Sequence, residues 1–278
     1  MLTLLEVLNR STAYLDKAGI PSPKFEAQLL MSHALKMERL QLFMKFDRPL
    51  AEAELAAIRE PLSRRARGEP YAYIVGSREF YSRDFAVGAG VLIPRPDTEI
   101  LVEAALEHCE GDEVFVADIG AGTGCVGLTL ALERPGVKLY AVERSEAATG
   151  FLKRNVEGHG LAARVGVLRG DLLAPIPRSR PIDVVVSNPP YIATAELSSL
   201  EVSKWEPREA LDGGADGLDV YRRLIPAAAA RARRAVLVEI GHDQGDAVSG
   251  LFREAGLEPS VLKDLSNNDR VVVGSAAT

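Results

Sequence analysis

The chain contains the stretch Val114-Phe115-Val116-Ala117-Asp118-Ile119-Gly120-Ala121-Gly122-Thr123-Gly124, in which a short apolar segment runs directly into a loop with glycine at every second position. A helical pattern follows over 125–133. Glycine is favoured where a chain turns sharply from a strand into a helix and where a ligand approaches the backbone. The spacing is G-x-G-x-G, whereas the loop that binds the pyrophosphate of NAD has the spacing G-x-G-x-x-G. The loop therefore favours a ligand other than NAD, although such a loop also occurs as a purely structural turn.

Short apolar segments alternate with helical segments downstream of this loop. Such alternation implies a mostly parallel sheet with helices on both faces. Near the end, two apolar segments flank Ser266-Asn267-Asn268-Asp269, which predicts an antiparallel hairpin at one edge of the sheet. The sequence thus predicts an α/β, Rossmann-like fold. The predicted strands are 114–118, 138–143, 164–169, 182–187, 235–240, 257–263 and 270–274, a helix is predicted over 243–255, and 172–181 is predicted to be a loop.

The first 70 residues have an almost entirely helical pattern. Leu8, Thr12 and Leu15 recur at four- and three-residue steps, as on one face of a helix. Ser22-Pro23 is typical of an N-cap followed by proline at the first helical position, and 51–67 again has a helical period. We therefore predict a small helical domain at 1–70.

A different pattern begins at residue 71. Alternating residues on both sides of Ser82-Arg83-Asp84 predict a β-hairpin with this tripeptide as its polar turn. After Pro94-Arg95-Pro96, Asp97 or Thr98 is expected to cap a helix that runs through residue 108. We therefore predict a hairpin linker at 71–93 and the α/β domain at 94–278.

Composition argues against several classes of function. With 33 Lys and Arg against 39 Asp and Glu, the formal net charge is -6, so we expect no stable nucleic-acid binding, which usually requires a basic excess. The two cysteines, Cys109 and Cys125, are not at metal-ligand spacing, which is typical of a reducing cytoplasm and predicts no metal site. We expect no membrane segment, because the apolar runs are short or interrupted by charges.

Three carboxylates end or follow predicted strands and are candidates for contact with a cofactor. Glu143, at the end of the second strand, is placed to accept hydrogen bonds from ribose hydroxyls. Asp171 follows the third strand and is placed to accept from an adenine amino group, with Leu172 against the ring; a turn cap is nearly as good an explanation for Asp171. Asp118 either lies near the ligand, where a carboxylate would suit a positively charged group such as a sulfonium or an ammonium, or anchors the glycine loop.

The fourth strand leads into Asn188-Pro189-Pro190-Tyr191 at the same edge of the sheet. An amide nitrogen is a poor nucleophile, because its lone pair is delocalised into the carbonyl, so orientation and electrostatics must promote its reaction. The Asn188 side-chain oxygen and the Pro189 carbonyl can each accept one N–H of a target NH₂ group. Pro190 stiffens the turn, and the Tyr191 ring can pack on a planar amide. The motif predicts methylation of a planar nitrogen.

These motifs together resemble class I methyltransferases that modify planar nitrogens. More narrowly, the chain resembles the peptide chain release factor glutamine methyltransferases over almost its whole length. The stretches that carry this resemblance are Ile93-Pro94-Arg95-Pro96-Asp97-Thr98-Glu99, Glu206-Pro207-Arg208 with Ala210-Leu211, Gly213-Gly214 with Asp216-Gly217-Leu218, and Asp264 with Asn268-Asp269-Arg270. Two departures are Glu143, where the family usually has Asp, and the arginine-rich 231–234, where a Gly-Gly turn is common.

The resemblance implies transfer of a methyl group from S-adenosylmethionine to the glutamine of a Gly-Gly-Gln motif in bacterial release factors. It implies that Gly120, Ala121, Gly122, Thr123, Gly124, Glu143 and Asn188 bind the cofactor, that Asn188, Pro189, Pro190 and Tyr191 bind the glutamine, and that the helical domain binds the release factor. Glutamine of a ribosomal protein and adenine N6 of a nucleic acid remain alternative targets, and a binding protein with a methyltransferase fold is the alternative that is not an enzyme.

Overall fold

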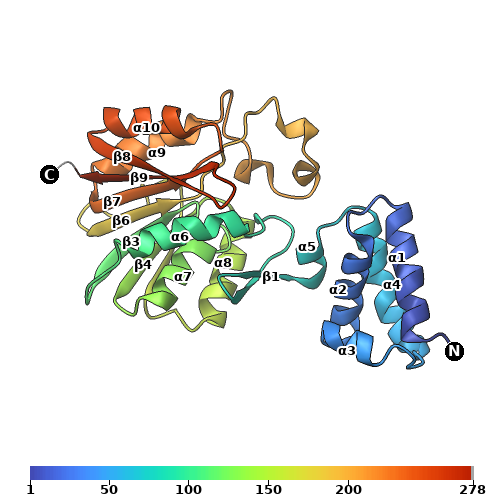
Figure 1. Cartoon of the computed structure of the whole chain (residues 1–278). Coiled ribbons are helices and arrows are strands. Elements are labelled where there is room, and N and C mark those ends of the chain that lie inside the picture. The colour runs from blue at the N-terminus through green and yellow to red at the C-terminus, as the bar shows by residue number, and fades with distance from the viewer. Residues whose placement is uncertain (277–278) are drawn as a thin grey trace. The chain divides into compact units, whose positions relative to one another are not determined.

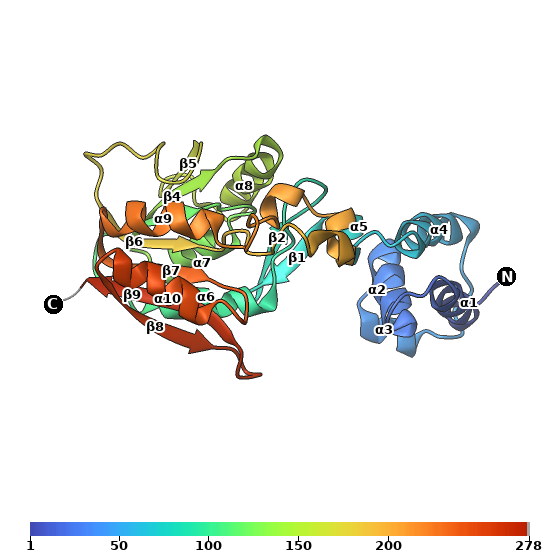
Figure 2. The ribbon, with the colours of Figure 1, turned by 90° about the horizontal axis from the view of Figure 1, so that it is seen from above.

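In the computed structural model, which describes residues 1–276, the glycine loop connects an interior strand of a seven-stranded sheet to a helix (Figure 1). The strand order is β5-β4-β3-β6-β7-β9-β8, with β5 and β8 at the two edges (Figure 2). The first five are parallel, and β9 is antiparallel to both β7 and β8. The predicted Rossmann-like fold with an antiparallel edge hairpin is confirmed. The strands are β3 (Val114–Ile119), β4 (Val137–Glu143), β5 (Val165–Arg169), β6 (Ile182–Ser187), β7 (Ala232–Glu239), β8 (Leu257–Lys263) and β9 (Asp269–Ala276).

Helices cover both faces of this sheet, as the alternating pattern predicted (Figure 1). Every residue of β6 is buried, which explains why that strand is a continuous apolar run broken only by Asp183. One face packs against α6 (Glu99–Leu106), α7 (Cys125–Glu133) and α8 (Glu146–Gly158), and the other packs against α9 (Asp219–Ala229) and α10 (Gly245–Glu254). Short 3₁₀ turns are η1 (Pro96–Thr98), η2 (Leu197–Ser199), η3 (Glu201–Lys204) and η4 (Arg208–Ala210).

The carboxyl ends of the parallel strands are level with one another. Ile119 of β3 is paired with Val142 of β4 and with Ser187 of β6, and Ser187 is paired with Val238 of β7. Gly120, Glu143, Asn188 and Glu239 each come directly after one of these four paired residues. The glycine loop and the other three residues therefore lie at the same edge of the sheet.

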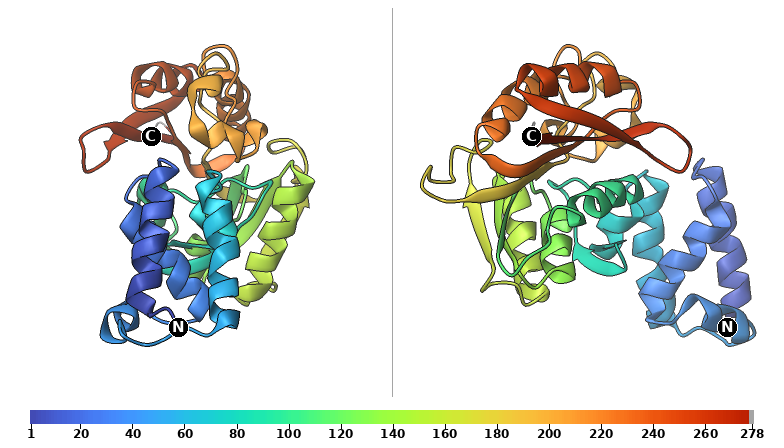
Figure 3. Two further views of the ribbon diagram at one scale, coloured as in Figure 1. Left: turned by 90° about the vertical axis from the view of Figure 1, so that its right-hand side faces the viewer. Right: turned by 60° about the vertical axis from the view of Figure 1, so that its left-hand side comes forward.

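The chain divides into two compact units, Met1–Ser77 and the part from Arg78 onward. The first unit consists of helices (Figure 3), and it has its own core, which includes Leu4, Leu15, Leu30 and Met31. Its helices are α1 (Leu4–Lys17), α2 (Pro23–Leu35), α3 (Arg39–Met44), α4 (Glu52–Ala66) and α5 (Tyr71–Val75). The helical pattern of residues 1–67 is confirmed, whereas α3 and α5 were not predicted. The assignment of separate recognition, linker and methyltransferase domains stays a prediction.

The hairpin was predicted with the wrong turn. The strands are β1 (Ser77–Phe80) and β2 (Arg83–Ala86), and the turn is Tyr81-Ser82, with φ angles of 50° and 57°. Left-handed φ at both central residues is the geometry of a two-residue turn that matches the twist of the strands. Arg83 belongs to the strand and pairs with Glu133 of α7.

The cap predicted for the next helix also differs. Thr98 precedes α6 in helical conformation, and its hydroxyl accepts a hydrogen bond from Asn188 instead of capping the first turn. In the described part of the chain, no helix is long and apolar enough to cross a bilayer.

Candidate active site

A cavity lies at the carboxyl ends of β3, β4 and β6, within the second unit. It brings together most of the residues predicted from the sequence, from four segments of the chain. Predicted residues in its lining are Gly120, Ala121, Gly122, Thr123, Glu143, Asp171, Leu172, Asn188 and Pro190. Gly124, Pro189 and Tyr191 are absent from the described lining residues, so their predicted roles rest on the motif alone.

Glu143 holds the glycine loop in place. Its Oε2 accepts the backbone N–H of Gly122 at 2.8 Å, and its Oε1 accepts the N–H of Ser145 at 2.7 Å. The side chain is 9% exposed. Each carboxylate oxygen has a second lone pair, so the group can still accept hydrogen bonds from a ligand in the cavity.

The glycines of the loop meet different surroundings. A Cβ on Gly120 would have no described heavy atom within 4 Å, so the backbone there faces open space. A Cβ on Gly124 would lie 2.5 Å from Cδ1 of Leu152, and its φ of +83° is left-handed. Gly120 therefore leaves room for a ligand, whereas Gly124 allows α7 to pack closely against α8.

Asp118 is buried at the end of β3 and also lines the cavity. Its Oδ2 accepts the N–H of Gly127 in α7 at 2.9 Å. Burial raises the pKa of Asp118 to about 7, and the charge of Glu143 acts in the same direction. Two roles were predicted for Asp118, contact with the ligand and anchoring of the loop. The hydrogen bond from Gly127 favours the anchoring role.

Asp171 and Leu172 form part of the cavity wall beyond β5. The Asp171 carboxylate is about half exposed and forms an ion pair with Arg223 of α9. Leu172 has a left-handed φ of +47°, which turns the chain away from the strand. The predicted contact of both residues with an adenine ring stays a prediction.

The Asn188-Pro189-Pro190-Tyr191 turn is held from several sides. Nδ2 of Asn188 donates to Oγ1 of Thr98 at 3.1 Å. The Tyr191 carbonyl accepts a hydrogen bond from Nε2 of Gln244 at 3.0 Å. Burial raises the pKa of the Tyr191 hydroxyl to about 12. The hydroxyl is therefore uncharged at neutral pH.

Two glycines of the 213–218 segment lie directly against this turn. A Cβ on Gly213 would lie 2.8 Å from the Pro190 carbonyl oxygen, and a Cβ on Gly217 would lie 2.3 Å from the Tyr191 carbonyl oxygen. The backbone of Gly213 also donates to the Ile192 carbonyl at 2.8 Å. The glycine-rich segment thus supports the turn from behind, which gives a physical reason for its place among the motifs.

The segment 206–208 is tied to the opposite wall of the cavity. Glu206 is buried, and its carboxylate accepts the backbone N–H of Ile93 at 3.1 Å and pairs with Arg95. Pro207 lines the cavity, whereas Arg208 is mostly exposed and pairs with Asp212. The segment therefore borders the site and is more than a surface loop.

Glu239 was not singled out from the sequence. It is 1% exposed at the end of β7, beside Asn188 in register. Burial raises its pKa to about 7, while hydrogen bonding by Thr98 and Asn188 and the charge of Arg270 lower it. The position was predictable, because Glu239 lies near the carboxyl end of a predicted strand, 235–240, as Glu143 does in 138–143.

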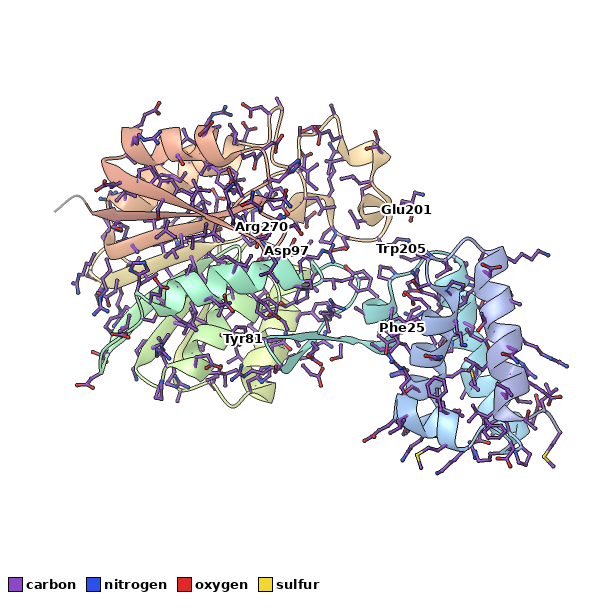
Figure 4. The ribbon with its side chains drawn as sticks, in the orientation of Figure 1. Phe25, Tyr81, Asp97, Glu201, Trp205 and Arg270 are labelled. Atoms are coloured by element: carbon purple, nitrogen blue, oxygen red, sulfur yellow. The ribbon has the colours of Figure 1, made fainter. Side chains whose placement is uncertain are left out.

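Arg270 links the edge hairpin to the residues around the site. Its guanidinium lies 3.3 Å from Asp97 and 2.9 Å from Asp264, and Figure 4 shows Arg270 next to Asp97. Asp264 in turn accepts the backbone N–H groups of Ser266 and Asn268, at 2.9 Å each. This network accounts for the 264–270 motif.

Other residues considered from the sequence have structural roles. Glu99 accepts the N–H of Tyr81 at 2.8 Å and so fixes the hairpin to α6. Arg231 donates to the carbonyls of Ile176 and Pro177, and Arg234 donates to those of His108 and Glu110. The arginine-rich segment therefore replaces a glycine turn with hydrogen bonds to neighbouring loops.

Comparison with known proteins extends this picture. The family "PrmC N-terminal domain" matches residues 6–76, and the family "Methyltransferase small domain" matches residues 96–204. The chain is 43% identical over 277 residues to the release factor glutamine methyltransferase of Geobacter sulfurreducens, across 98% of this chain and 96% of that protein. This chain belongs to the release factor glutamine methyltransferase family.

The same family includes a relative in Moorella thermoacetica, which is 42% identical over 275 residues and 97% covered on both sides. The resemblance noted in the sequence is thereby confirmed, and with it the assignment as a protein-(glutamine-N5) methyltransferase. The solved structure of the hMettl16 catalytic domain has a TM-score of 0.59 at 17% identity, covering 79% of this chain and 83% of that one. That likeness concerns the fold.

Proposed function

We propose that this chain transfers a methyl group from S-adenosylmethionine to the side-chain nitrogen of the glutamine in the Gly-Gly-Gln motif of a peptide chain release factor. The observation that carries the proposal is the position of Asn188, which lies at the wall of the cavity with its amide nitrogen donating to Thr98. This arrangement leaves Oδ1 as an acceptor for the N–H of a target amide.

The cavity has the chemistry that S-adenosylmethionine requires. Two buried carboxylates, Asp118 and Glu143, line it and suit a ligand that carries both a sulfonium and an ammonium charge. Glu143 would accept hydrogen bonds from the ribose, and the open space at Gly120 would admit the ligand against the backbone. Leu172 offers an apolar surface for the adenine, with Asp171 beside it. When bound, the cofactor supplies an electrophilic methyl group.

The residues at the end of β6 would hold the target amide. The Asn188 side-chain oxygen and the Pro189 backbone carbonyl can each accept one N–H of the NH₂ group. Two acceptors fix the direction of the nitrogen lone pair and favour positive charge as it develops on the nitrogen. Pro190 and Tyr191 would restrict and cover the planar group.

Methylation of the isolated substrates tests this function. A release factor and a Gln→Ala version at its Gly-Gly-Gln motif are incubated with labelled S-adenosylmethionine, and the modified residue is identified by mass spectrometry. We expect a single methyl group on the glutamine of the unaltered factor only. Equal labelling of both factors, or labelling of a ribosomal protein or of DNA with neither factor labelled, would contradict the proposal.

A further inference from the structure

Asn188 has two polar neighbours that come from other parts of the fold. Thr98, at the end of η1, is 2% exposed, and Glu239, at the end of β7, is 1% exposed. Ser187 of β6 is paired with Val238 of β7, which brings Asn188 and Glu239 to adjacent positions at the strand ends. All three side chains therefore meet at the edge of the cavity.

The contacts define which of these three side chains donates each hydrogen bond and which accepts it. Asn188 donates to the Thr98 hydroxyl oxygen at 3.1 Å, so the hydroxyl hydrogen is free to be donated elsewhere. The Glu239 carboxyl is the acceptor beside it, and hydrogen bonding by Thr98 and by Asn188 acts on the ionisation of this group. Oε2 of Glu239 is buried and, within residues 1–276, has no hydrogen-bond partner. In its ionised form this carboxylate only accepts hydrogen bonds, so it favours donors on its neighbours.

The direction of these hydrogen bonds bears on which of two orientations the Asn188 side-chain amide adopts. The two ends of an asparagine amide have nearly the same shape, so packing alone does not choose between them. If the amide were flipped, Nδ2 would point to the target NH₂ group, and two donors would face each other. The target amide would then lose one of its acceptors.

We propose that Thr98 and Glu239 are positioning residues that hold the nitrogen end of the Asn188 amide, so that its oxygen faces the substrate. The inference rests on the proposed function for the identity of the substrate, but the orientation of Asn188 is a property of the chain itself. The Thr98 hydroxyl accepts a hydrogen bond from Asn188 and donates toward Glu239. Glu239 is the last acceptor in this series.

Replacement of the Thr98 hydroxyl tests whether Thr98 acts through Asn188. Thr98→Val keeps the shape and removes the hydroxyl, whereas Thr98→Ser keeps the hydroxyl and is the matched control. We expect kcat for release factor methylation to fall at least about tenfold in Thr98→Val and to stay within about threefold in Thr98→Ser, with unchanged S-adenosylmethionine affinity in both. In an Asn188→Ala background, Thr98→Val should cause no further loss, because nothing is left to orient. Equal losses in the two backgrounds, or an unchanged kcat in Thr98→Val, would overturn the proposal.

A second measurement does not depend on the substrate. The side-chain NH₂ signals of Asn188, assigned by their loss in Asn188→Ala, should exchange slowly with water in the unaltered protein and in Thr98→Ser. They should exchange rapidly in Thr98→Val. Similar exchange in all three proteins would overturn the positioning role, whereas failure of the unaltered protein to methylate a release factor would count against the proposed function alone.

Discussion

Glu143 accepts the backbone N–H of Gly122 at 2.8 Å, across a separation of 21 residues. The carboxylate proposed to hold the ribose therefore also shapes the loop that would lie under the cofactor. On this proposal, cofactor binding and order in the loop would be coupled through one side chain, because the same group would support both.

The first prediction concerns this carboxylate. Glu143→Ala should weaken S-adenosylmethionine binding by roughly 1.5–3 kcal/mol, because charge-assisted hydrogen bonds are lost and the loop is released. Glu146→Ala is the matched control, since Glu146 is 81% exposed in the adjacent helix. Titration calorimetry on both variants makes the comparison. Equal affinities would mean that the ribose carboxylate is another residue.

The second prediction concerns catalysis. Asn188→Ala should lower kcat by on the order of 10²-fold or more, because loss of a preorganised polar group costs roughly 2–4 kcal/mol in the transition state. Calorimetry should show that S-adenosylmethionine affinity changes much less than kcat. A variant that keeps half of the turnover would contradict the proposed mechanism.

The third prediction separates backbone strain from contact with the site. Gly217 and Gly256 have almost the same φ, +75° and +78°, but only Gly217 lies against the Tyr191 carbonyl. Gly256→Ala should lose about 1–2 kcal/mol of stability from the left-handed backbone alone, and Gly217→Ala should lose more, because its Cβ also meets the backbone of the turn. Gly217→Ala should also lower kcat, because its Cβ displaces the turn that holds the substrate. Thermal unfolding and turnover are the measurements, and equal kcat in the two variants would argue against this support.

The fourth prediction concerns pH. The pKa of Glu239 is raised from 4.5 to about 7, so the folded chain binds this proton more tightly than the unfolded chain. Its contribution to stability is complete below the unfolded pKa and is lost as pH rises through about 7. The free energy of unfolding should therefore fall less between pH 4.5 and pH 7 in Glu239→Gln than in the unaltered protein. The difference should be roughly 1.4 kcal/mol per unit of pKa shift. Asp118 should account for part of the remaining slope.

Urea unfolding at pH 5 and pH 8 measures this effect. Glu258→Gln is a suitable control, because Glu258 is exposed on β8. The same slope in the unaltered protein and in Glu239→Gln would show that Glu239 ionises normally.

The fifth prediction concerns the helical unit. A chain shortened to begin at Ser77 should still bind S-adenosylmethionine, because every described residue that lines the cavity lies between Gly90 and Arg223. It should methylate an intact release factor poorly and a short Gly-Gly-Gln peptide as well as the full chain does. Full activity on the intact factor would exclude a recognition role for residues 1–76.

Much of the α/β unit was predictable because interior strands such as β3 and β6 are almost entirely buried. β6 coincides with the predicted 182–187, and the edge strand β8 coincides with the predicted 257–263. Glu143 was found as the residue that ends a strand, and Asn188 as the residue that follows one. An apolar run that ends in a polar side chain can be recognised in the sequence without any knowledge of long-range contacts.

The parts that were missed depend on contacts or on unusual backbone geometry. The α3 helix is six residues long and exposes Leu40, Phe43 and Met44, so it lacks the apolar stripe that reveals a helix. The Tyr81-Ser82 turn adopts left-handed φ without the usual Asn-Gly or Asp-Gly. The link from Asn188 to Thr98 spans 90 residues, and no local pattern encodes it.

The position of β9 has a consequence for synthesis of the chain. It lies between β7 and β8, although both precede it in the sequence. Until 269–276 have left the ribosome, the backbone of β7 has an unpaired edge along Ala235-Val236-Leu237-Val238, an apolar sequence suited to pairing with another nascent chain. Glu239, which is paired with Val271, ends this edge, so the pairing of β9 with β7 removes an aggregation hazard and also completes the surroundings of Asn188.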